Sequence, residues 1–104
     1  NIRAGIRAAA RLLTRGYVPF CPFLDFSLFL TDEAGGITDG QIKTYSLEWL
    51  RVCDAVLLLP GWERSTGTAR EMDEARNLGL PIYYSEEELY GDGSAKKRRG
   101  KAAL

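Results

Sequence analysis

The chain has 104 residues, of which 45% are hydrophobic and 11% aromatic, and these values are typical of a soluble globular domain with one core. Its 14 basic and 14 acidic residues balance, and the absence of histidine excludes a histidine-based triad and nearly every zinc site. No apolar run approaches the roughly 18 residues that a membrane span needs. We expect no membrane association, no metal and no cofactor.

The two cysteines, Cys21 and Cys53, are too few for a disulfide framework. They lie in a strand-like segment and at a helix end, which predicts that both are buried thiols. Free thiols without a disulfide framework are typical of a reducing compartment, so we expect a cytoplasmic protein.

The chain begins with a predicted helix and strand. Residues 1–15 repeat apolar side chains at helical spacing, and a second face, which we expect to be solvated, carries an arginine at every fourth position (Arg3, Arg7, Arg11 and Arg15). Gly16 ends this helix, and residues 17–21 form a short strand. The alternation of helix and strand predicts a parallel sheet with right-handed connections. Such a unit has a strand before its helix, so we expect that the first strand of the fold is absent from this chain.

An aromatic segment precedes the next helix. Its Phe26, Phe29 and Leu30 either line a base-binding pocket or pack in the core, which is the commoner use of such side chains. Asp39 is the expected N-cap of a helix over residues 40–52, whose apolar side chains fall largely along one face.

A buried strand, a loop and a helix form the candidate ligand site. Residues 54–59 are almost continuously apolar, which predicts a strand buried on both faces, and residues 67–78 predict a helix. In a doubly wound sheet, ligands bind beyond the carboxyl ends of the strands, where the connecting loop lies. Unpaired amides and the positive end of the helix dipole suit an anion at this place.

Five residues of the loop and helix start are candidate contacts to a substrate or its phosphate (Gly61, Trp62, Ser65, Thr66 and Gly67). The hydroxyls of Ser65 and Thr66, and the close backbone approach that Gly67 permits, suit a phosphate or a sugar hydroxyl. Capping of the helix is the alternative role of the two hydroxyls. Trp62 either stacks on a base or covers the edge of the core.

Glu71 is the candidate catalytic residue. A carboxylate in the first helical turn is favoured by the helix dipole, so a purely structural placement is common. In this position, however, Glu71 projects toward the ligand crevice on the face that it shares with Gly67. A carboxylate there is placed to attack the anomeric carbon of a sugar, which gives a covalent glycosyl-enzyme and expels a base.

The last part of the chain is predicted to hold a strand, a short helix and a basic tail. Residues 80–84 form the strand, and Ser85 with Glu88 begins the helix. We assign residues 1–90 to one domain and residues 91–104 to a disordered tail. The tail holds five cations (Lys96, Lys97, Arg98, Arg99 and Lys101), which leaves nine basic against thirteen acidic residues in the domain. We therefore expect no nucleic-acid binding except a weak contact through the tail.

The order of the elements, together with VPFCPFL, LEWLRVCDAVLLLPGWERSTGTAREMDEA and LGLPI, resembles the nucleoside 2-deoxyribosyltransferase-like superfamily, in particular its small uncharacterised bacterial and phage branch. The resemblance covers residues 1–84. It implies an α/β fold with a flavodoxin/Rossmann-like parallel sheet, helices on both faces and assembly as a homo-oligomer. In characterised relatives, a Glu six residues after a loop Ser is the catalytic nucleophile, and Ser65 and Glu71 keep this spacing. In the nucleotide-hydrolysing relatives, the Ser and neighbouring amides contact the 5′-phosphate.

Two departures from the family pattern concern the sugar. Relatives begin with a strand that ends in a Gly-Pro turn, and this sequence starts after that turn. Transferases place an Asp just before the Leu-x-x-Leu of the helix that precedes the buried strand, and Ser46 occupies that position here. The resemblance therefore supports Glu71 as the nucleophile more strongly than it supports deoxyribose recognition or transfer activity.

These observations predict an enzyme that cleaves or transfers the N-glycosidic bond of a nucleoside or nucleotide through Glu71. One alternative is a non-catalytic nucleotide-binding module that uses the same crevice. A second alternative is an interaction domain that acts through its basic tail.

Overall fold

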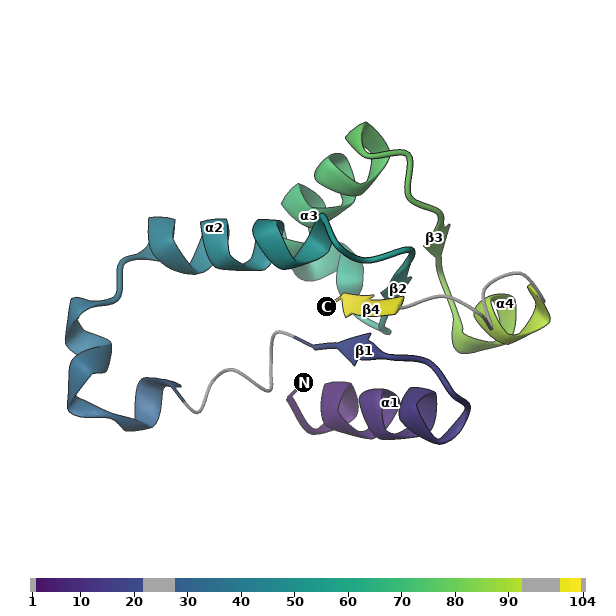
Figure 1. Ribbon diagram of the computed structural model, residues 1–104, viewed down its shortest axis with the longest axis horizontal. Helices are drawn as coiled ribbons and strands as arrows, with labels where there is room; N and C mark the ends of the chain where they lie inside the picture. Colours follow the sequence, from purple (N-terminus) through teal and green to yellow (C-terminus); the bar gives the residue numbers. More distant parts are fainter. Residues whose placement is uncertain (1, 22–27, 93–99, 104) are drawn as a thin grey trace.

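A computed structural model describes residues 2–21, 28–92 and 100–103 of the chain (Figure 1). The fold is mixed α/β, and helices alternate with short strands along the chain. In chain order the elements are α1 (Ile2–Thr14), β1 (Pro19–Phe20), η2 (Asp32–Gly36), α2 (Asp39–Leu50), β2 (Val56–Leu58), η3 (Trp62–Arg64), α3 (Thr66–Asn77), β3 (Ile82–Tyr83), α4 (Glu86–Gly91) and β4 (Gly100–Ala103).

The four strands form one sheet in the order β1-β4-β2-β3, and every neighbouring pair is parallel. The last strand of the chain lies between the first two, where Ala102 pairs with Leu57 of β2 and Lys101 pairs with Phe20 of β1. The sequence analysis expected disorder over residues 91–104, whereas Gly91 ends α4 and Gly100–Ala103 forms β4. Residues 93–99 and 104, with the tail cations Lys96 to Arg99, lie outside the described residues.

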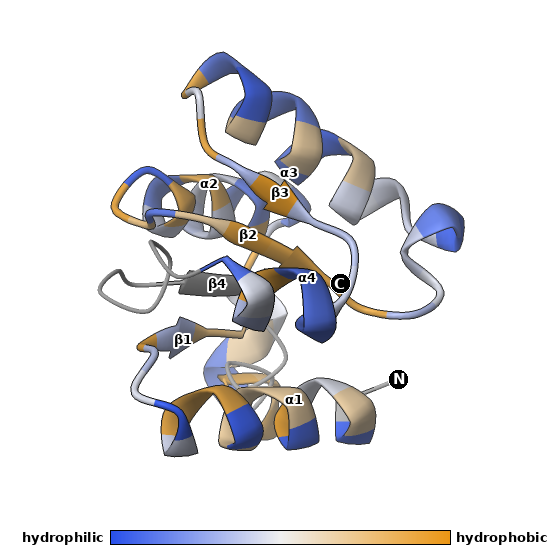
Figure 2. Cartoon of the chain, turned by 90° about the vertical axis from the view of Figure 1, so that its right-hand side faces the viewer, coloured by the Kyte–Doolittle hydropathy of each residue, from blue (hydrophilic) through white to orange (hydrophobic). Residues whose placement is uncertain are grey.

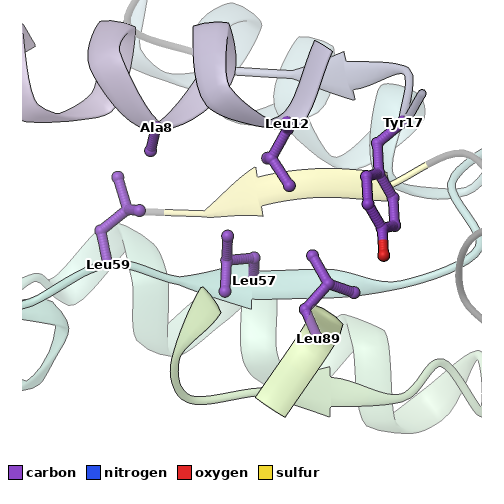
Figure 3. Close-up of a cluster of buried hydrophobic side chains, with 6 residues drawn as sticks. All are labelled: Ala8, Leu12, Tyr17, Leu57, Leu59 and Leu89. Carbon is purple, nitrogen blue, oxygen red and sulfur yellow. The ribbon is translucent and has the colours of Figure 1, made fainter. Parts of the chain in front are cut away.

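Side chains of β2 pack on both faces of the sheet because successive residues of a strand point to opposite sides. Leu57 and the neighbouring Leu59 join a cluster with α1 and α4, shown in Figure 3, whose other members are Ala8, Leu12, Tyr17 and Leu89. Val56 and Leu58 join a second cluster on the opposite face, completed by Leu50, Met72 and Ala75 of α2 and α3. Figure 2 shows α1 on one side of the sheet and α2 and α3 on the other.

The arginine face of α1 is exposed, and two of its members reach α4. Arg11 binds Glu86 through two hydrogen bonds, which Nε and Nη2 donate at 2.8 and 2.6 Å. The guanidinium of Arg15 lies 3.9 Å from the ring centre of Tyr90. These contacts fix α4 against α1, beside the core cluster that contains Leu89.

The N-cap of α2 differs from the one expected. Thr38, not Asp39, caps α2: its side chain accepts from the Gln41 amide, and the Gln41 side chain accepts from the Thr38 amide. Asp39 is the first helical residue. Thr and Gln at this spacing form the reciprocal capping box, which satisfies two amides at once. Ser85 caps α4 as predicted, since its hydroxyl accepts from the Glu88 amide at 3.1 Å.

Cys21 and Cys53 are buried and form no disulfide with each other, and the burial is as expected. Cys21 follows β1, and the Cys53 thiol donates to the Trp49 carbonyl at 3.4 Å at the end of α2. Across the described part of the chain, none of the helices has the length and apolar character to cross a membrane.

Candidate functional site

A cavity of about 380 Å³ lies between residues 39–47 of α2 and the first two turns of α3. Because α2 leads into β2 and α3 leads out of it, both helix starts lie at the carboxyl end of this strand. This is the end of a parallel sheet at which α/β proteins bind ligands. The lining residues are Phe29, Asp39, Ile42, Lys43, Ser46, Leu47, Thr66, Gly67, Arg70 and Glu71.

Glu71 is in the wall of this cavity and is only 8% exposed. It lies on the inner face of α3, one helical turn from Thr68 and Ala75, which are fully buried. A carboxylate in the wall of a cavity at this end of the sheet is a candidate functional residue. The structure therefore places the predicted nucleophile in a cavity of the size of small-molecule sites.

Two further predicted contacts, Thr66 and Gly67, line the same cavity from the first turn of α3. A methyl group at Gly67 would meet nothing nearer than the Ser65 hydroxyl at 3.8 Å, so the packing does not require glycine there. The backbone at Gly67 is nevertheless open to a ligand in the cavity.

Ser65 caps α3 and does not line the cavity. Its hydroxyl accepts a hydrogen bond from the Thr68 amide at 3.2 Å, which is the helix-capping role that the sequence left as the alternative. The Thr68 hydroxyl is buried and has no hydrogen-bond partner among the described residues.

Gly61 and Trp62 lie outside the cavity wall. Gly61 adopts a φ of +92°, a conformation that side chains disfavour, and it precedes the short helix η3. Trp62 packs against the α2–α3 core cluster, and its ring centre lies 5.6 Å from that of Tyr84. Of its two predicted roles, the structure gives Trp62 a place at the edge of the core.

The sequence analysis did not single out two cations that line the cavity, Lys43 of α2 and Arg70 of α3. Both are exposed, and neither forms an ion pair or a hydrogen bond with any described residue. Arg70 directly precedes the predicted nucleophile Glu71, and this neighbourhood in the sequence was a signal that could have identified it. Lys43 lines the cavity because α2 packs against α3. A local sequence pattern does not predict such a tertiary contact.

Three other lining residues come from segments that the sequence analysis considered. Asp39 and Ser46 lie on α2 on the same side as Lys43, at positions separated by about two helical turns. Phe29 lines the cavity and is 46% exposed, so it does not pack in the core. Leu30 is 86% exposed, and Phe26 lies outside the described residues.

The cavity thus combines a buried carboxylate, hydroxyls from two helices, two cations without partners among the described residues and an aromatic side chain. With Asp39, the wall holds two carboxylates and two cations, and this set suits a small polar molecule that bears a ring. In the described ranges, no three His, Cys, Asp or Glu side chains are grouped so as to hold a metal ion.

Comparison with known proteins gave one match. A family model described as Domain of unknown function (DUF4406) matches residues 4–84, a range that contains every residue lining the cavity. No curated protein and no solved structure matches the chain.

Proposed function

We propose a function for this chain from the premise that it belongs to the DUF4406 family. It cleaves or transfers the N-glycosidic bond of a nucleoside or nucleotide, and Glu71 is the nucleophile. The fold that we propose is the flavodoxin/Rossmann-like arrangement, in which a parallel sheet carries helices on both faces and the ligand lies at the carboxyl ends of the strands.

The burial of Glu71 in the wall of the cavity is the observation that carries this proposal. A structural glutamate in the first turns of a helix gains from the dipole while it stays in water, and it needs no burial. A nucleophilic carboxylate must instead reach a carbon atom from which water is largely excluded. The spacing of Ser65 and Glu71, which resembles that of nucleoside 2-deoxyribosyltransferase-like enzymes, supports the same residue.

The proposed reaction has two steps. A Glu71 carboxylate oxygen forms a bond to the anomeric carbon, while the bond from that carbon to the base nitrogen breaks and its electron pair leaves with the base. The departing base takes a proton from solvent. Water then attacks the anomeric carbon of the glycosyl ester and restores the carboxylate, which is hydrolysis, or a second base attacks it, which is transfer.

The other cavity residues have supporting roles in this proposal. Thr66 and the Gly67 backbone contact the sugar or its substituents from the start of α3, where the dipole favours negative charge. Phe29 offers an aromatic surface to the base. We also propose a homo-oligomer in the cytoplasm, as the resemblance and the free thiols suggest.

The experiment is a panel of nucleosides and 5′-nucleotides in which release of free base is followed by chromatography. We expect the wild-type chain to release base from at least one member and Glu71→Gln to lose at least about 10³-fold in turnover, because removing a covalent nucleophile removes the pathway. Glu74→Gln is the matched control, since Glu74 lies on the same helix but does not line the cavity. The control should keep wild-type turnover.

The panel also separates the alternatives. Saturable binding of a nucleotide with no base release, at an affinity that Glu71→Gln leaves unchanged, would identify a non-catalytic binding module. Salt-sensitive binding of nucleic acid that is lost on removal of residues 95–104 would identify an interaction domain that uses the tail.

A further inference from the structure

The two exposed cations of the cavity form no ion pair with a described carboxylate, as is also the case for Arg3, Arg7, Arg15 and Arg64. Arg11, Arg51 and Arg76 each bind a carboxylate, at N–O distances of 2.6, 2.6 and 3.3 Å. Lys43 and Arg70 make no such pair within the described residues, although they come from different helices and line the same cavity. Two cations that converge on one space without a carboxylate partner are arranged to share an anion.

We propose that Lys43 and Arg70 bind the phosphate of a 5′-phosphorylated substrate, so that this site selects nucleotides over nucleosides. The proposal rests on the function proposed above, because it places the sugar against Glu71. It assigns the phosphate to a pair of side chains on the α2 and α3 walls, not to the hydroxyl of Ser65.

The position of Ser65 is the first argument for this assignment. Its hydroxyl is held by the Thr68 amide and lies outside the cavity wall. The Ser65 hydroxyl keeps its proton to donate while it caps α3, so its position outside the cavity wall, and not the cap, separates it from a phosphate in the cavity. Lys43 and Arg70, in contrast, line the cavity.

The depth of the charged groups is the second argument. Glu71 is buried, whereas Lys43 and Arg70 are exposed, so the carboxylate and the two cations lie at different depths of one cavity. The groups of a nucleotide match this difference in depth. Its anomeric carbon must reach the buried Glu71, whereas its phosphate, with a charge of about −1.5 to −2 at neutral pH, stays in contact with water.

Binding of small probes tests the proposal without any need for turnover. The probes are ribose 5-phosphate, ribose and inorganic phosphate, titrated calorimetrically into the full chain and into Glu71→Gln. We expect ribose 5-phosphate to bind at least tenfold more tightly than ribose to both proteins, because one charge-assisted contact to phosphate is worth about that factor. Equal binding of the two sugars by the wild-type chain would overturn the proposal.

Variants then locate the phosphate. Lys43→Gln and Arg70→Gln should each reduce the preference for ribose 5-phosphate about tenfold, while the affinity for ribose stays unchanged. Lys43→Arg and Arg70→Lys should retain most of it. Arg7→Gln, which removes an exposed cation from α1, is the control and should retain all of it. A preference that survives in the Lys43→Gln/Arg70→Gln double variant would overturn the assignment.

The remaining outcomes are also decisive. Inorganic phosphate that binds as tightly as ribose 5-phosphate would identify a site for the free ion and overturn the choice of a sugar phosphate. If no nucleotide releases base but the phosphate preference is present and depends on Lys43 and Arg70, the proposed reaction fails and the phosphate subsite stands. If base is released equally well from nucleosides and nucleotides, the reaction stands and the subsite fails.

Discussion

Glu86 of α4 accepts hydrogen bonds from Arg11 of α1 and from the Tyr90 hydroxyl, both at 2.8 Å to its Oε1 atom. The hydrogen bonds from Arg11 lower the pKa of Glu86, against the opposing effect of burial, and the bond from Tyr90 adds to the lowering. Burial, together with the hydrogen bond to Glu86, raises the pKa of Tyr90 to about 12. At neutral pH both residues are therefore held in the forms that bind each other.

The lowered pKa of Glu86 predicts a stability contribution that is present at neutral pH and is lost on acidification. We expect Glu86→Gln to reduce the free energy of unfolding by about 1 kcal/mol at pH 7, since Arg11 is half exposed and the pair is screened by water. At pH values below the ordinary carboxyl pKa range, Glu86 becomes protonated. The wild-type chain then loses the ion pair as well.

Urea unfolding of both proteins between pH 7 and pH 3 measures this effect, and the difference in stability should shrink as the pH falls. Glu87→Gln is the matched control, because Glu87 is exposed and lies beside Glu86 on the same helix. A Glu86→Gln deficit of the same size at both ends of the range would contradict the pairing.

At the scale of the element, the start of α3 serves both the fold and the proposed site. Ser65 caps the helix, Thr66 and Gly67 line the cavity, and Glu71 follows on the buried face. The cap orients the first turn, so the residues that line the cavity are held by one that does not line it.

Ser65→Ala should therefore affect stability and leave ligand binding largely unchanged. We expect a loss of about 1 kcal/mol in the free energy of unfolding, and Ser65→Asp should restore it because Asp is an equally good cap. Thermal unfolding and titration with ribose 5-phosphate give both quantities for each variant. A Ser65→Ala chain with wild-type stability and a clearly weakened affinity would show that the hydroxyl contacts the ligand after all.

The comparison of predicted and observed elements shows which physical signals are local. The repeat of apolar residues at helical spacing predicted the helices near 1–15 and 67–78, and the observed helices begin and end within one residue of those limits. The start of α2 was misplaced by one residue, because Thr38 and Asp39 are both good caps and only Thr38 has Gln41 three residues later to complete a capping box.

Only part of the cavity wall was predictable from the segment that supplies Glu71. Gly61, Trp62 and Ser65 do not line the cavity, and Arg70, which does, was not predicted. Glu71, Thr66 and Gly67 belong to a single strand–loop–helix unit, and all three line the cavity. Lys43 entered the wall through the contact of α2 with α3, which depends on tertiary packing. The role of Trp62 was also not predictable, because its amphipathic ring suits either stacking on a base or covering the edge of the core. The structure places it against the core cluster and Tyr84.

For the whole molecule, the position of β4 was the feature that local patterns concealed. Gly100–Ala103 follows a run of charged and small residues that is typical of disorder, yet β4 pairs with both β1 and β2. Since β1 pairs with β4 and has no other strand partner among the described residues, β4 connects β1 to the rest of the sheet.

Ala102→Pro should weaken the sheet strongly. Proline cannot donate a backbone hydrogen bond, so it removes a ladder bond and is found almost only in edge strands. We expect a lower midpoint of thermal unfolding and faster hydrogen exchange at the backbone of Leu57, which pairs with Ala102. Ala102→Ser, which keeps the amide, should unfold close to the wild-type temperature. An Ala102→Pro chain as stable as wild type would mean that β4 contributes little to the sheet.

The covalent step at Glu71 is the centre of the proposed function, and mass spectrometry of the intact protein tests it most directly. The substrate found in the nucleotide panel would be replaced by its 2′-fluoro analogue, since an electronegative substituent destabilises the oxocarbenium-like transition state and slows breakdown of the intermediate. We predict that the protein gains the mass of the sugar or sugar phosphate, that proteolysis locates this mass on Glu71, and that Glu71→Gln gains none. Base release from the substrate by Glu71→Gln at the wild-type rate, or a sugar adduct on any other residue, would contradict the account.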